Sequence, residues 1–131
     1  MNTYKTIAAQ HTFIHKEKAS KFIAYAFPIT TEEEFKVELQ KIKKQYYDAT
    51  HHCYAFVTNP ENPIYKHSDD REPSGTAGIV IEGQLKSLQL LNVAVIVIRY
   101  FGGTKLGTGG LKQSYKLATQ QCLLHTNVIN K

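Results

Sequence analysis

The most informative part of the chain is residues 93–111, which read VAVIVIRYFGGTKLGTGGL. Residues 93–98 are apolar at every position, which is typical of a central strand covered on both faces. The positions that follow place five of the eight glycines within residues 102–110. Thr108 can then cap a helix, whose apolar stripe consists of Leu111, Tyr115, Ala118 and Cys122. The stretch predicts a buried strand, a glycine loop and a helix that folds back on the sheet.

The rest of the chain alternates strand and helix signals. Strands are predicted at residues 12–15, 21–27, 50–57 and 64–67. A first helix is predicted after Thr31, which can form a capping box with Glu34. A second is predicted from Gly75 towards Leu88, with Ser74 as its N-cap. Because strands occur in adjacent pairs with helices between them, we expect the α+β class, as a two-layer α/β sandwich.

The composition predicts one domain spanning residues 1–131. Hydrophobic residues make up 42% of the chain, which is enough for a core. No apolar run approaches the ~20 residues needed to cross a bilayer, and the N-terminus lacks the features of a signal peptide. Two cysteines, Cys53 and Cys122, provide neither a disulfide framework nor a four-ligand zinc site. We therefore expect a cytoplasmic protein without a membrane partner.

The net charge of +5 is unevenly distributed. All eleven Asp and Glu residues precede residue 83, whereas residues 83–131 hold six of the sixteen Lys and Arg residues and no acid. A solvated surface that keeps the protein soluble is the simpler interpretation. The alternative is a surface for an anionic partner, because lysines without nearby carboxylates leave a positive field.

Residues 99–111, called the glycine block here, admit two interpretations. Glycines allow close backbone approach, and free N–H groups at a helix start favour an anion. Residues proposed for an anion or nucleic-acid site are Gly102, Gly103, Lys105, Gly107, Thr108, Gly109, Gly110, Lys112 and Lys116. The other interpretation is a tight structural turn. The block contains neither the dinucleotide-binding fingerprint nor a P-loop.

Residues 68–78, called the acidic block, read SDDREPSGTAG. Asp69, Asp70 and Glu72 are three carboxylates within four residues, a group that could hold Mg²⁺. The favoured interpretation is structural: these carboxylates pair with Arg71 and Arg99 and order two loops. We expect no metal and no other cofactor.

Residues 49–53, called the histidine block, read ATHHC. Strand alternation places His51 and Cys53 on one face, so a thiol–imidazole pair is geometrically feasible. A buried cysteine acting as a small apolar group is the commoner case. Two such ligands are fewer than a catalytic metal site requires, and no nucleophile–base–orienter set is apparent. No catalytic residue is assigned.

These three blocks, together with residues 18–24 (KASKFIA), resemble the signature of the IMPACT/YigZ family. The resemblance runs from about Lys18 to the last predicted helix. It implies the family's N-terminal domain, whose fold is similar to domain 2 of ribosomal protein S5. It also implies that the family's second, ferredoxin-like domain is absent from this chain.

Three functions follow as expectations. The resemblance implies a non-enzymatic regulatory or interaction domain linked to translation, whose partner is a protein of the translation machinery or of its regulation. The glycine block and the acid-free segment support the alternative, a module that binds RNA or phosphate. The third is a hydrolase that uses Asp69, Asp70, His51 or Cys53.

Overall fold

The computed structural model describes residues 3–131 and is organised around the apolar strand at 93–98. The elements in chain order are β1 (Lys5–Ile7), β2 (His11–Glu17), β3 (Ser20–Pro28), α1 (Glu32–Gln45), β4 (His51–Thr58), β5 (Ile64–Ser68), α2 (Gly78–Ser87), β6 (Val93–Tyr100), α3 (Gly107–Leu124) and β7 (Val128–Asn130). None of the helices in this part of the chain combines the length and the apolar character that a bilayer crossing requires.

Strand β6 occupies the centre of a five-stranded antiparallel sheet. The strand order is β2-β3-β6-β4-β5, so β6 pairs with β3 on one side and β4 on the other. Every side chain from Val93 to Arg99 is buried, which confirms the predicted central strand. The register places His51 of β4 opposite Arg99 of β6, and this pair brings the histidine block to the start of the glycine block.

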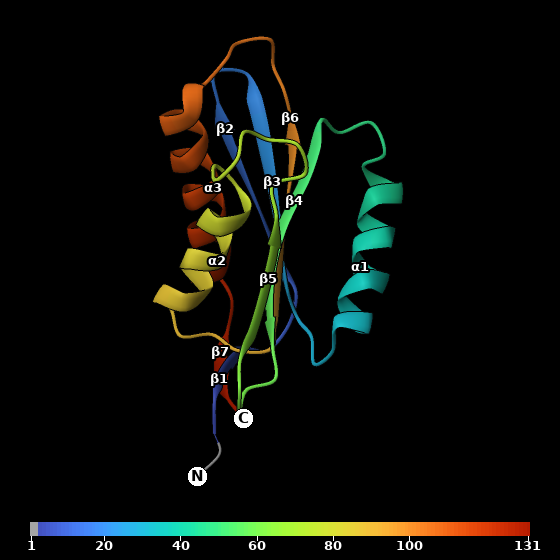
Figure 1. Ribbon diagram of the computed structural model, residues 1–131, viewed down its shortest axis with the longest axis vertical. Coiled ribbons are helices and arrows are strands. Elements are labelled where there is room, and N and C mark those ends of the chain that lie inside the picture. Colours follow the sequence, from blue (N-terminus) through green and yellow to red (C-terminus); the bar gives the residue numbers. More distant parts are fainter. Residues whose placement is uncertain (1–2) are drawn as a thin grey trace.

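The sheet carries helices on both faces (Figure 1). Cys53, Ala55 and Val57 pack beneath α2 and α3, whereas Phe56 packs beneath α1 on the opposite face. This division follows from the alternation of side chains along a strand. The α+β class is confirmed. Helix α1 adds a third layer to the two expected, because the central strand is apolar on both faces and each face needs a cover.

Helix α1 forms as the sequence predicts. Thr31 accepts a hydrogen bond from the Glu34 N–H at 3.1 Å, and a Glu34 carboxylate oxygen accepts from the Thr31 N–H at 3.1 Å. The buried stripe consists of Phe35, Leu39 and Ile42. Local capping and periodicity are sufficient to define this helix.

The predicted start of α2 is wrong. The helix begins at Gly78 rather than Gly75, and Ser74 is exposed and does not cap it. The Asp69 carboxylate accepts hydrogen bonds from the N–H groups of Gly75, Ala77 and Gly78, at 3.0, 3.1 and 2.7 Å. A residue from the preceding turn therefore satisfies the free amides that a local N-cap would otherwise take.

The short strands β1 and β7 pair antiparallel and bring the two ends of the chain together. The Tyr4 N–H donates to the Lys131 carbonyl at 2.8 Å, and the Lys131 N–H donates back to Tyr4 at 2.9 Å. The glycine block lies at the other end of the long axis of the molecule (Figure 1).

Candidate functional site

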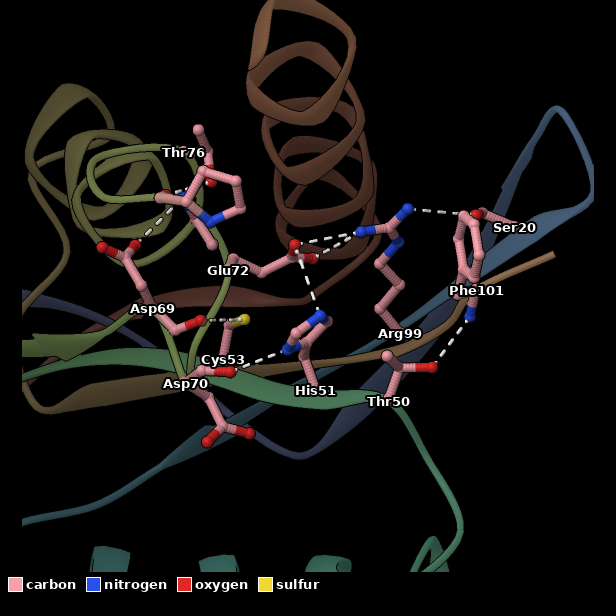
Figure 2. Close-up of polar contacts among 12 residues, drawn as sticks. Ser20, Thr50, His51, Cys53, Asp69, Asp70, Glu72, Thr76, Arg99 and Phe101 are labelled. Carbon is pink, nitrogen blue, oxygen red and sulfur yellow. Dashed lines mark hydrogen bonds and ion pairs between the residues drawn. The ribbon is translucent and has the colours of Figure 1, made fainter. Parts of the chain in front are cut away.

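The three sequence blocks meet at one cavity of about 420 Å³. It lies between the β4 start, the acidic block and the loop that leads into α3. Its lining consists of Thr50, His51, Glu72, Pro73, Arg99, Phe101, Lys105, Leu106, Gly107, Thr108 and Leu111. A cavity of this size is in the range that holds small organic ligands. Figure 2 shows the polar groups around it.

A buried ion pair between Arg99 and Glu72 forms one wall. Arg99 Nη1 donates to both Glu72 oxygens, at 3.0 and 2.9 Å, and the two side chains are 6% and 2% exposed. Arg99 Nη2 also donates to Ser20 Oγ at 3.3 Å. The guanidinium carbon lies 5.5 Å from the ring centroids of both Phe22 and Phe101. The predicted pairing of Arg99 with the acidic block is therefore present.

Glu72 is also bound from α3 and β4. The Tyr115 hydroxyl donates to Glu72 Oε2, and His51 Nε2 lies 3.4 Å from Glu72 Oε1. Burial raises the pKa of Tyr115 far above its usual value, so its hydroxyl remains a proton donor. His51 Nδ1 lies 2.7 Å from the Asp70 carbonyl oxygen, which fixes the imidazole ring (Figure 2).

Cys53 lies beneath this network and does not pair with His51. Its sulfur is 3.1 Å from the Asp69 carbonyl oxygen and 3.3 Å from the Tyr115 hydroxyl. Burial raises the pKa of the Cys53 thiol well above its usual value, which disfavours the nucleophilic thiolate. The thiol–imidazole interpretation is therefore wrong, and Cys53 behaves as a small buried residue.

The three carboxylates of the acidic block point to different donors. Asp69 caps α2. Burial alone would raise the pKa of Asp69, but the hydrogen bonds from three backbone N–H groups outweigh burial, so its pKa lies below the usual value. Asp70 accepts from the His52 N–H at 2.6 Å, and Glu72 pairs with Arg99. They do not converge as Mg²⁺ ligands. Arg71 is exposed and has no carboxylate partner among residues 3–131, so its predicted ion pair is wrong.

The glycine block contains one glycine that close packing requires and an uncapped helix start. A Cβ on Gly102 would clash with the Ala19 carbonyl oxygen, so glycine is required where this loop passes the β2–β3 turn. Gly107, at φ +74°, begins α3 with Leu106 as N-cap and no side-chain cap. The predicted capping role of Thr108 is wrong, and the first amides of α3 have no capping side chain.

The structure separates the residues that were grouped for an anion site. Lys105, Gly107 and Thr108 line the cavity. The remaining members of the group lie outside the lining: Gly102, Gly103, Gly109, Gly110, Lys112 and Lys116. Both Lys112 and Lys116 are exposed on α3.

Sequence reasoning missed two polar members of the site. The sequence pattern places Tyr115 only on an apolar stripe, yet a hydroxyl at a core position signals a buried partner. Thr50 N–H donates to the Arg99 carbonyl at 2.9 Å, and Thr50 Oγ1 accepts from the Phe101 N–H at 3.0 Å. These bonds connect the histidine block to the glycine block.

Comparison with known proteins identifies relatives along the whole chain. A family model described as the Impact N-terminal domain matches residues 18–123. IMPACT family member YvyE of Bacillus subtilis is 39% identical across 100% of this chain and 60% of that protein. IMPACT family member YigZ of Escherichia coli is 34% identical across 94% of this chain and 61% of that protein. The chain thus spans about three fifths of the length of these relatives.

Two solved structures share the fold. A crystal structure of a hypothetical protein superposes with a TM-score of 0.96 at 32% identity, covering 100% of this chain and 65% of the other. The two-domain translational regulator Yih1 superposes with a TM-score of 0.55 at 23% identity, covering 93% and 47%.

Proposed function

The chain belongs to the Impact N-terminal domain family, and from that premise we propose that it is a non-enzymatic domain that acts in the regulation of translation by binding a partner. Its membership in the family and its likeness to a protein described as a translational regulator support the link to translation. A partner in the translation machinery implies a cytoplasmic location.

One observation carries the proposal that the cavity is the binding site. The histidine, acidic and glycine blocks are far apart in the chain, yet all three contribute to its lining. Behind the cavity, the buried side chains of Arg99, Glu72 and Tyr115 hydrogen-bond to one another and hold these blocks together. Rigid support of this kind lowers the entropic cost of binding.

Binding is favoured over hydrolysis because the candidate catalytic groups are already engaged. His51 Nδ1 is held by the Asp70 carbonyl oxygen, and the Asp70 carboxylate accepts from the His52 N–H. Asp69 caps a helix, and the Cys53 thiol is buried with a raised pKa. A hydrolase needs a nucleophile and a base that face the substrate. These candidate groups instead bond to backbone atoms of the neighbouring segments.

A cell-free translation reaction from E. coli or B. subtilis, where relatives occur, tests the proposal. We expect the purified chain to change the rate of protein synthesis and to cosediment with ribosomal particles or with a translation factor bound to them. Lys105→Glu should weaken both effects because Lys105 lines the cavity. Lys112→Glu is the matched control, since it makes the same charge change outside the lining.

An unchanged synthesis rate together with no cosedimentation, at an excess of folded protein, would reject the proposal. An equal loss in both lysine variants would reject the cavity as the binding site.

A further inference from the structure

We infer that the cavity between the acidic and glycine blocks binds a phosphorylated nucleoside, either as a free nucleotide or as the 5′ end of an RNA strand. This inference rests on the proposed function in one respect: it assigns a ligand class to the cavity through which the domain is proposed to act.

The charge of the lining is unbalanced and positive. Glu72 is its only carboxylate, and Arg99 neutralises it within the wall. Lys105 is exposed and has no ion-pair partner among residues 3–131, so its ammonium group is available to a ligand. The first turn of the 18-residue helix α3 adds uncapped N–H groups at Gly107 and Thr108. This combination favours an oxyanion such as a phosphate group.

Arg99 gives an independent indication of an incomplete site. Its side chain is only 6% exposed, and its Nε–H has no hydrogen-bond partner among the described residues. A buried guanidinium donor without a partner is costly. Arg99 is part of the cavity lining beside the Phe101 ring, so an acceptor bound in the cavity lies next to this guanidinium.

The apolar part of the lining indicates what the phosphate is attached to. Pro73, Leu106 and Leu111 give the cavity apolar walls, and Phe101 stands at its edge with much of its ring exposed. Inorganic phosphate would leave these surfaces unused. A nucleobase can stack on an exposed aromatic ring while its phosphate reaches Lys105. The cavity volume of about 420 Å³ suits a ligand of nucleotide size.

Two hydroxyl groups fit the sugar–phosphate part of such a ligand. Thr50 Oγ1 accepts from the Phe101 N–H, so its own O–H remains free to donate. Thr108 lies at the start of α3 and also lines the cavity.

The experiment uses 5′-AMP, adenosine and inorganic phosphate as probes, with calorimetry at low salt and ¹⁵N-resolved NMR of the whole chain. We expect 5′-AMP to bind more tightly than either fragment and to shift the amide signals of residues 50–51 and 99–108. Lys105→Ala should weaken 5′-AMP binding about tenfold, the effect of one charge-assisted hydrogen bond. Phe101→Leu keeps an apolar side chain beside Arg99 but removes the aromatic ring. It should therefore weaken the binding of 5′-AMP and leave the binding of inorganic phosphate unchanged.

The double variant Lys112→Ala/Lys116→Ala is the matched control, because it removes two exposed charges outside the lining. It should change 5′-AMP affinity by less than about twofold. NMR spectra also establish that each variant is folded.

A second comparison separates the two sources of the ligand. The ligand is an RNA end if a 5′-phosphorylated RNA oligonucleotide binds more tightly than both its 5′-hydroxyl form and 5′-AMP. The ligand is a free nucleotide if 5′-AMP binds more tightly than the oligonucleotide. Three results would overturn the inference: no 5′-AMP binding at millimolar concentration, equal binding of adenosine, or an equal loss in the double-lysine control. Because these measurements use the purified chain alone, they are independent of the translation assay, and either proposal can fail without the other.

Discussion

Arg99 donates from Nη1 to both carboxylate oxygens of Glu72, and this ion pair joins the end of the central strand to a loop 27 residues earlier in the chain. Tyr115 binds the same carboxylate from α3, so one buried group connects a strand, a loop and a helix. The geometry of the cavity depends on this connection.

Removal of Arg99 should therefore destabilise the protein strongly. Arg99→Ala leaves a buried carboxylate without its counter-ion, which costs on the order of 3–5 kcal/mol. Arg71→Ala is the matched control: Arg71 and Arg99 are the only arginines, and Arg71 is exposed. We expect a large fall in the thermal midpoint for Arg99→Ala and little change for Arg71→Ala. Equal midpoints for the two variants would contradict the assignment.

A double variant tests whether the loss arises from the unpaired charge. Arg99→Met combined with Glu72→Gln removes both charges, so it should be less destabilising than Arg99→Met alone. Urea unfolding of the two single variants and the double variant measures this coupling. Strict additivity would show that the two side chains do not interact.

Asp69, rather than Ser74, should control the stability of α2. Asp69→Asn should lower the free energy of unfolding by about 1–2 kcal/mol at neutral pH, whereas Ser74→Ala should have little effect. The folded-state pKa of Asp69 lies below its usual 3.8, so its contribution is complete above that value and is lost as the pH falls through the folded-state pKa. The difference between wild type and Asp69→Asn should thus shrink below about pH 4. A difference that grows on acidification would contradict this role.

Two glycines of the glycine block should respond in opposite ways to alanine. Gly102→Ala makes a methyl group clash with the Ala19 carbonyl oxygen and should be strongly destabilising. Gly109 lies within α3 and has open space around its Cβ position, so Gly109→Ala should be neutral or stabilise by up to about 1 kcal/mol. Thermal unfolding of both variants checks this, and a similar loss in each would show that the whole block is constrained.

Both cysteines should resist alkylation in the folded protein. Burial raises the pKa of Cys122 to about 12 and that of Cys53 further. We expect iodoacetamide at pH 8 to label neither residue until urea unfolds the chain, as judged by mass spectrometry of the intact protein. Rapid labelling of Cys53 under native conditions would restore the nucleophile interpretation.

The elements that the sequence predicts well are those with local causes. The capping box at Thr31 and the doubly apolar run at 93–98 each define an element without help from distant residues. The start of α2 was misplaced because its cap, Asp69, lies nine residues before Gly78, outside the reach of local capping rules. Strands β1 and β7 have three residues each and pair with one another, and the one further bridge of β1 joins Lys5 to Leu90. Elements this short leave no pattern to detect in the sequence.

The candidate site was predicted in outline. The acidic and glycine blocks do meet, and Arg99 does bind a carboxylate of the acidic block. Tyr115 reaches Glu72 across 43 residues, a contact that only the packing of α3 on the sheet creates. The same packing separates Lys105 from Lys112 and Lys116, which a linear sequence places in one basic group.

The pairing of β1 with β7 makes this fold suitable for circular permutation. Tyr4 and Lys131 are already hydrogen-bonded to each other, so a short flexible linker can join the two ends without strain. New ends can be opened in the turn at residues 59–63, which connects β4 and β5 and is largely exposed. Because β1 and β7 lie at the opposite end of the long axis from the glycine block (Figure 1), a label or carrier protein attached beyond either strand leaves the cavity unobstructed.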